Sequence, residues 1–167
     1  MFVTNSMKTL ILVLSFCSCI AQAQVDTEGS SIMKPITTLF TGLNLGDSSM
    51  VRSAFTADAT MASISKDKAG NVTLRRESSL TGFLKAIGSP HKDSWSEPIW
   101  DARIEVDGNF AQVWTQYAFY AGKNFIHCGV DAFQLIKTNA TWKIFHLVDT
   151  RRKDGCSVPK PISDQFK

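Results

Sequence analysis

The amino-acid sequence predicts an α+β fold in which helices cover one face of a curved antiparallel sheet. Apolar residues recur at helical spacing in the first half of the chain, and the period then changes to the alternation typical of strands. The four runs of the second half are joined by short turns, as in consecutive antiparallel strands. Aromatic residues make up 10% of the 167 residues and supply enough bulk for a sizeable core.

Composition and charge exclude several classes of protein. The chain is 44% hydrophobic and 20% charged, which is ordinary for one globular domain and argues against a disordered tail, a collagen-like repeat or a multidomain assembly. The formal charge is +3, and it is +2 from Gln24 onward because Lys8 is the only charged residue before that position. Nucleic-acid binders usually carry a strongly basic stripe, so we expect no nucleic-acid partner.

Residues 1–23 are predicted to be a secretory signal peptide. Lys8 precedes a short apolar run that ends in Ala21-Gln22-Ala23, a small-x-small cleavage site. The run is shorter than the roughly 20 residues that a membrane helix needs. We therefore expect a secreted or periplasmic protein that begins just after Ala23 and has no membrane contact after cleavage. A lipoprotein anchored at Cys17 or Cys19 and a buried N-terminal helix are the alternatives.

One domain is expected over residues 31–157, preceded by a loose segment over 24–30 and followed by a tail over 158–167. Its helices are indicated by apolar residues at helical spacing and by capping residues such as Asp47. The apolar positions of the first and third helices are Ile32, Met33, Ile36, Leu39, Phe40 and Leu43, and then Leu80, Phe83, Leu84 and Ile87.

The strands are predicted from alternating runs and from the turns between them. Asp107-Gly108 is a strong signal for a tight hairpin, and Asn139 marks the centre of a second short turn. The expected strands cover residues 59–65, 72–76, 95–106, 110–122, 125–137 and 141–150.

This layout and its local motifs resemble the nuclear transport factor 2-like superfamily, also called ketosteroid isomerase-like or SnoaL-like. The matching segments are residues 55–59, the hairpin over 104–114, and the closing hairpin formed by 129–135 and 142–144. Within the superfamily the chain looks most like exported bacterial members of the lumazine-binding type, which the run His127-Cys128-Gly129 suits.

The resemblance implies a cone-shaped fold with a strongly curved antiparallel sheet of about six strands and three helices from the N-terminal half on one face. It also implies a cavity between sheet and helices. The superfamily holds both enzymes and non-enzymes, so the fold alone does not decide the function.

Aromatic residues of the strands are the first candidates for ligand contacts. The strands carry more aromatic mass than one helix layer needs to cover, which favours a cavity; a filled core and a dimer interface are the alternatives. The predicted ligand-binding residues are Trp100, Trp114, Tyr117, Phe119, Phe133 and His146.

Asp131 is the leading polar residue of the expected cavity. Side chains alternate along a strand, so His127, Gly129, Asp131 and Phe133 share one face. An aspartate among apolar neighbours must be paired, hydrogen-bonded or protonated. The resemblance implies that Asp131 moves a proton if the protein is an enzyme, with Tyr117 or His127 donating to a developing oxyanion. The alternative is a structural aspartate bonded to a neighbouring strand or to Arg103.

Cys128 and Cys156 are the two cysteines that remain after the signal peptide, and exported thiols usually pair. Counting across the turn near Asn139 places Cys128 level with about Arg151, only five residues from Cys156. We therefore expect a structural disulfide between them, with two unpaired thiols as the alternative.

No phosphate-binding glycine loop, HExxH or GxSxG motif occurs in the sequence, so neither a metal nor a cofactor is predicted. The expected function is that of an exported protein that binds a small apolar or aromatic molecule in a partly apolar cavity. The alternatives are a cofactor-free isomerase or dehydratase that uses Asp131, and an interaction module that forms a homodimer through its sheet.

Overall fold

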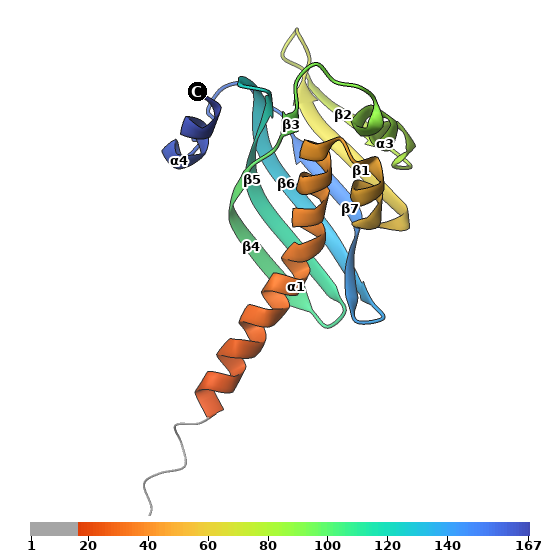
Figure 1. The fold of residues 1–167 in the computed structure, drawn as a ribbon, viewed down its shortest axis with the longest axis vertical. Coiled ribbons are helices and arrows are strands. Elements are labelled where there is room, and N and C mark those ends of the chain that lie inside the picture. The colour runs from red at the N-terminus through yellow and green to blue at the C-terminus, as the bar shows by residue number, and fades with distance from the viewer. Residues whose placement is uncertain (1–16) are drawn as a thin grey trace, which may run out of the picture.

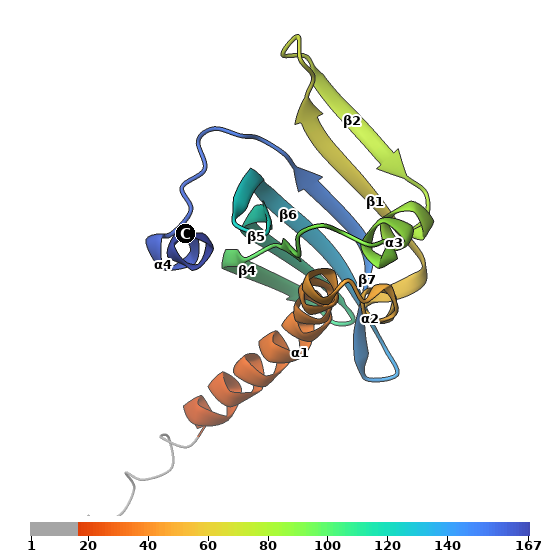
Figure 2. The same ribbon diagram turned by 45° about the horizontal axis from the view of Figure 1, so that its top comes forward.

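A computed structural model gives the backbone of residues 17–167 and the side chains from Thr27 onward, and it confirms the α+β class. Figures 1 and 2 show a curled, unclosed sheet whose inner face is covered by helices. The elements are α1 (Cys17–Leu45), α2 (Ser48–Ser53), β1 (Phe55–Lys66), β2 (Val72–Glu77), α3 (Thr81–Gly88), β3 (Trp95–Ser96), β4 (Ile99–Asp107), β5 (Phe110–Ala121), β6 (Asn124–Thr138), β7 (Thr141–Thr150), α4 (Lys160–Ser163) and a final 3₁₀ turn (Asp164–Phe166).

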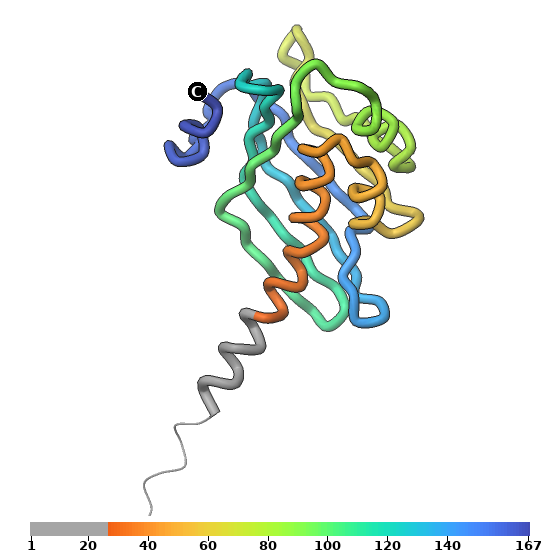
Figure 3. The backbone as a smooth tube through the Cα atoms, in the orientation of Figure 1, coloured from red at the N-terminus to blue at the C-terminus, as the bar shows by residue number. Residues whose placement is uncertain are grey.

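Helix α1 is longer than the sequence predicted. The loose segment expected over 24–30 is wrong, because α1 runs through it without a break. Its contacts explain this: Glu28 forms a 3.0 Å ion pair with Lys137 of β6, and the Ser31 hydroxyl donates to the carbonyl of Thr27. Figure 3 shows the described part of α1 lying along the sheet. The predicted cleavage point after Ala23 falls within this helix, and residues 1–16 lie outside the described part of the chain.

The sheet has seven strands in the order β2-β1-β7-β6-β5-β3, with β4 also pairing to β5. All pairs are antiparallel except β1 with β7, which is parallel. The strand predicted over 95–106 is divided into β3 and β4 at Glu97-Pro98. Proline has no amide proton to give to a sheet ladder, and here its carbonyl accepts from the amide of Ala118 instead.

The main core lies between α1 and the sheet. Buried side chains of α1 at the predicted helical spacing, Ile32, Ile36 and Leu39, pack against β6 and β7. Phe133 is fully buried there and meets Phe40 edge to face, with ring centroids 6.2 Å apart. Because burial of apolar area is the main stabilising term, this contact layer holds the helices on the sheet.

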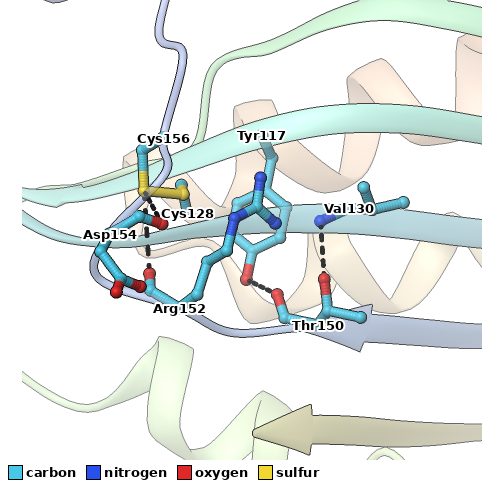
Figure 4. The surroundings of a disulfide bond; sticks show 7 residues. All are labelled: Tyr117, Cys128, Val130, Thr150, Arg152, Asp154 and Cys156. Carbon is cyan, nitrogen blue, oxygen red and sulfur yellow. Dashed lines mark hydrogen bonds between the residues drawn. A yellow bond between two sulfur atoms is a disulfide. The ribbon is translucent and has the colours of Figure 1, made fainter.

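A disulfide joins Cys128 to Cys156, as predicted, with Cα atoms 5.9 Å apart. Cys128 pairs with Arg152, one residue beyond the predicted partner level. Figure 4 shows how the tail turns back here, with the Cys156 sulfur beside the carbonyl of Arg152. Beyond it, the Phe166 ring stacks on Tyr120 at 3.8 Å, so the C-terminal segment covers part of the outer sheet face.

Candidate functional site

A cavity of about 320 Å³ opens between the inner face of the sheet and helices α1 and α3. One side is apolar and aromatic, and the other is polar and ionisable. The apolar lining comes from Leu39, Phe40, Leu43, Met61, Phe83, Ala86, Trp95, Phe119 and Leu147, and the polar lining from Ser63, Arg75, Glu77, Glu97, Tyr117, His127, Asp131, Asp149 and Arg151.

A row of polar residues crosses five strands at the level of the cavity. The register pairs Thr115 of β5 with Asp131 of β6, and Asp131 with Asp149 of β7. Asp149 then pairs with Ser63 of β1, and Ser63 with Arg75 of β2. Directly paired residues of neighbouring strands point to the same face, so the register alone gathers these side chains into one band.

The carboxyl groups of Asp131 and Glu97 form a hydrogen-bonded pair in this band. Asp131 is 1% exposed, and its Oδ2 has no hydrogen-bond partner among the described residues. Two ionised carboxylates have no proton to donate, so the bond requires that one of them is protonated. Burial and then the charge of Asp149 raise the pKa of Glu97 to about 8, and burial and then the charge of Glu97 raise the pKa of Asp131 well above its usual value.

Glu97 is the site residue that sequence reasoning missed. It stands at the break between β3 and β4, where Pro98 interrupts the ladder, and from there it reaches over the cavity to β6. A sequence signal for Glu97 did exist. Glu97 directly precedes Pro98, and this pair interrupts a predicted strand that is otherwise rich in aromatic residues. The predicted alternative partner of Asp131 is wrong: Arg103 lies exposed beside Trp114.

Asp149 gathers a second set of polar groups. It accepts hydrogen bonds from the Ser63 hydroxyl and from Arg151 Nε, the latter at 2.6 Å. The Tyr117 hydroxyl lies 3.3 Å from Asp149 Oδ2 and 2.9 Å from the carbonyl of Thr150, the contact drawn in Figure 4. A phenol has one proton, and both of its acceptors here belong to β7. The Tyr117 proton is therefore directed to β7 in this structure, and a role for Tyr117 as an oxyanion donor stays a prediction.

Gly129 makes the position of Tyr117 possible. A Cβ atom at Gly129 would lie 1.7 Å from the carbonyl oxygen of Thr150 and 2.7 Å from Tyr117 Cε1. Contacts under 3 Å essentially never occur at a real Cβ atom. The missing side chain is thus what lets the Tyr117 ring cross β6 and reach β7.

His127 lines the cavity on the face predicted for it. Its ring stacks on Phe119, with centroids 5.2 Å apart, and meets Tyr117 edge to face. Burial and the Arg151 charge lower the pKa of His127 to about 4. At neutral pH the ring is therefore an uncharged imidazole, which can donate or accept one hydrogen bond to a ligand.

Four of the six predicted ligand-binding residues lie away from the cavity. Phe133 is in the core, and Trp100 packs near the disulfide on the opposite side of the sheet. Trp114 is 44% exposed. It lies three positions from Tyr117 in β5, which places the two side chains on opposite faces. His146 bonds Thr60, because a bulge after Gln134 shifts the register by one residue.

The curled sheet and its covering helices have the fold of solved structures that are described as NTF2-like. An NTF2-like protein from Shewanella baltica has a TM-score of 0.57 at 20% identity, covering 77% of this chain and 97% of that one. An NTF2-like protein with a cystatin-like fold from Novosphingobium aromaticivorans has a TM-score of 0.63 at 12% identity, covering 92% of this chain and 97% of the other.

A third similar structure is described as a putative scytalone dehydratase from Novosphingobium aromaticivorans, with a TM-score of 0.61, 14% identity, and coverage of 78% and 88%. Residues 27–148 match the family described as "Putative lumazine-binding", and the chain belongs to this family. A search of curated proteins found no match. Within residues 17–167, no helix is both long and apolar enough to cross a membrane.

Proposed function

We propose that the cavity binds one small, flat, partly apolar molecule through the Asp131–Glu97 carboxyl pair. The observation that carries this proposal is the buried Asp131–Glu97 carboxyl pair at the cavity wall, where Asp131 Oδ2 accepts no hydrogen bond from a described N–H or hydroxyl group. Buried polar groups are nearly always hydrogen-bonded in folded proteins, so we expect a ligand group to bond this pair. The volume of about 320 Å³ suits a small ligand.

The chemistry of the pair supports a ligand with an amide-like or imide-like edge. Because the pKa values of both carboxyl groups are raised, both groups can hold a proton: one proton joins the pair, and the other leaves an O–H donor beside a C=O acceptor. This arrangement complements an edge that presents C=O beside N–H. Lumazine, which the family description names, has such an edge on a flat heterocycle. The aromatic walls formed by Phe40, Phe83, Trp95 and Phe119 suit the faces of such a ring.

Titration calorimetry with lumazine tests this proposal. The wild type is expected to bind one equivalent, and Asp131→Leu, which keeps similar bulk but removes both polar oxygens, should weaken binding about tenfold or more. Trp114→Leu on the outer face is the control and should leave the affinity unchanged. Equal affinity in Asp131→Leu and wild type, or no binding of lumazine at all, would contradict the proposal.

A second candidate function is proton transfer, supported by two converging carboxyl groups whose pKa values are raised toward or above neutrality. A general acid or base works best when its pKa lies near the working pH. One carboxylate of the pair would take a proton from carbon next to a carbonyl group and return it at another position. This is the chemistry of an isomerase or dehydratase that needs no cofactor.

Asp131→Asn separates the two candidates. The amide keeps one donor and one acceptor, so lumazine binding should persist, but it cannot carry a proton between positions. We expect the wild type to convert a cyclic β,γ-unsaturated ketone to its conjugated isomer. The rise in ultraviolet absorbance of the conjugated product measures this reaction. Asp131→Asn should slow it about a hundredfold or more. No conversion by the wild type would contradict this second candidate.

A further inference from the structure

A second hollow lies where the turn between β6 and β7 meets helix α1 and the end of α2. Its volume is about 380 Å³. In Figure 1 this turn is at the lower end of the sheet, far from the turn between β1 and β2. None of the residues that line this hollow lines the cavity, so the two are separate sites. We call it the α1–β7 hollow, and the lining residues that matter here are Lys34, Pro35, Ala54, Ala140, Trp142 and Lys143.

The α1–β7 hollow carries positive charge with no matching negative charge. Lys34 of α1 and Lys143 of β7 both line it, and none of its described lining residues is acidic. Neither lysine forms an ion pair with a described residue. Lys143 Nζ donates to the carbonyl of Ser53, which uses one of its three N–H donors. Glu28, which precedes Lys34 on α1, is paired with Lys137 instead. The hollow is therefore suited to an anion.

The indole of Trp142 is a second and independent sign of a ligand. Trp142 lines the hollow and is only 2% exposed. Its Nε1 is buried and has no hydrogen-bond partner among the described residues. An indole N–H can only donate, and buried polar groups are nearly always hydrogen-bonded. Bulk water does not reach this nitrogen, so we expect its acceptor to be a group that enters the hollow beside the ring.

The number of charges and donors narrows the class of anion. A phosphomonoester carries a charge of about −1.5 to −2 at pH 7 and has three strong acceptor oxygens. The two ammonium groups and the indole N–H match both properties, whereas a carboxylate has one charge and two oxygens. Pro35, Ala54 and Ala140 add apolar surface, and the volume leaves room for a small body attached to the phosphate.

We propose that the α1–β7 hollow is a second binding site, which holds the phosphate group of a small phosphomonoester between Lys34, Lys143 and the Trp142 indole. This site goes beyond the proposed function of the cavity and does not depend on it, because the two share no lining residue.

Nuclear magnetic resonance of the indole N–H groups tests the proposal directly. The chain has four tryptophans, and the signal that disappears in Trp142→Phe identifies Trp142. Phenyl phosphate is the probe. Its addition should move the Trp142 indole proton downfield until the site is saturated, because the proton gains a charged acceptor. Benzyl alcohol, which has a ring but no charge, should leave the signal in place, and benzoate should bind about tenfold more weakly.

Variants of the lysines provide the matched comparison. Lys34→Gln/Lys143→Gln should weaken phenyl phosphate binding about tenfold or more. Lys68→Gln removes the same kind of charge from the turn between β1 and β2, which does not line the hollow, and should leave the affinity unchanged. The cavity variant Asp131→Leu should also bind phenyl phosphate as the wild type does, whether or not the cavity binds lumazine.

Three results would overturn the second site. The first is no saturation by phenyl phosphate up to about 10 mM. The second is binding that leaves the Trp142 indole signal unmoved, and the third is equal affinity in the double lysine variant and the wild type. Benzoate that binds as tightly as phenyl phosphate overturns the assignment to a phosphomonoester.

Discussion

Gly129 has no room for a side chain. A methyl group there would meet the Thr150 backbone and the Tyr117 ring at once, and neither can withdraw without breaking the Tyr117 hydrogen bonds. We predict that Gly129→Ala lowers the free energy of unfolding by about 3 kcal/mol or more, measured by urea denaturation.

Gly82→Ala is the matched control for that measurement. Gly82 lies within α3, and its nearest prospective contact is Glu77 Oε2 at 3.4 Å, an ordinary separation. Alanine is the better helix former, so the change should stabilise the protein by about 0.5–1 kcal/mol or have little effect. If Gly129→Ala were as well tolerated as Gly82→Ala, the close crossing of Tyr117 over β6 would be incorrect.

Glu97 is expected to make stability depend on pH. Its folded-state pKa of about 8 lies above the ordinary value of 4.5, so the folded state keeps a proton that the unfolded state has lost. The resulting stabilisation is complete below the unfolded pKa and is lost as pH rises toward 8. The free energy of unfolding should therefore fall between about pH 7 and pH 8, by at most about 1.4 kcal/mol per pH unit for this one group.

Glu97→Gln should flatten that slope. His127 contributes a slope of the opposite sign, because its lowered pKa of about 4 makes the folded state bind fewer protons below about pH 6.5. Measurements at pH 7 and above avoid the pH range in which His127 contributes. Denaturant titrations of the wild type and of Glu97→Gln between about pH 7 and pH 8 compare the two slopes of unfolding free energy against pH. An unchanged slope in Glu97→Gln would mean that Glu97 is already ionised in the folded state.

The sequence predicted correctly which residues share a face within one strand, but it did not predict which residues from different elements come into contact. The shared face of His127, Gly129 and Asp131 follows from alternation alone, and the structure shows it. The partner of Asp131 could not be found in this way, because Glu97 comes from a different part of the chain. His146 was misplaced because a bulge cannot be read from alternating polarity.

At the scale of elements, the disulfide holds the C-terminal segment against the outer face. It closes a loop of 28 residues, and the chain-entropy relation gives about 3–4 kcal/mol of stabilisation for such a loop. We predict that Cys156→Ala lowers the unfolding free energy by about this amount. The tail should also become sensitive to proteolysis, because α4 and the stacked Phe166 have few other anchors.

The same variant should leave ligand affinity unchanged. Cys128 points to the opposite face of β6 from its neighbours His127 and Gly129, so the disulfide lies away from the cavity. Limited proteolysis with mass spectrometry measures release of the tail, and calorimetry measures binding. Two freely alkylatable thiols in protein isolated without reductant would show that the disulfide does not form in the cell.

Most helices and strands were predicted because local patterns specify them. Asp107-Gly108 forms the expected turn, with Gly108 at φ 58° and Asp107 paired with Phe110. The division of the 95–106 strand at Pro98 was available from the sequence, since proline rarely continues a ladder. The parallel pairing of β1 with β7 was not, because no local pattern reports which distant strands become neighbours.

For the whole molecule, export remains the prediction with the widest consequence. We expect the mature chain to begin at Gln24, which retains Glu28 and its ion pair with Lys137. Intact-mass measurement of protein from the native source checks this directly. A longer chain, or one that begins at Cys17 or Cys19 with acyl groups attached, would contradict it.

The homodimer through the sheet also remains a prediction at this scale. Trp114 and Phe110 are 44% and 41% exposed, and the C-terminal segment covers only part of the outer face. If that face mediates self-association, sedimentation velocity should show a dimer in the wild type and a monomer in Trp114→Glu. A monomeric wild type at high concentration would exclude this arrangement.

The parallel pairing of β1 with β7 has a consequence for the order of folding. β7 lies between β1 and β6 in the sheet, so the hairpin of β1 and β2 cannot join the other strands until the final strand has been made. Contacts between such distant segments must overcome a large loss of chain entropy before they stabilise anything. The chain therefore cannot close its cavity before β7 has been made, and the candidate site is among the last parts of the molecule to form.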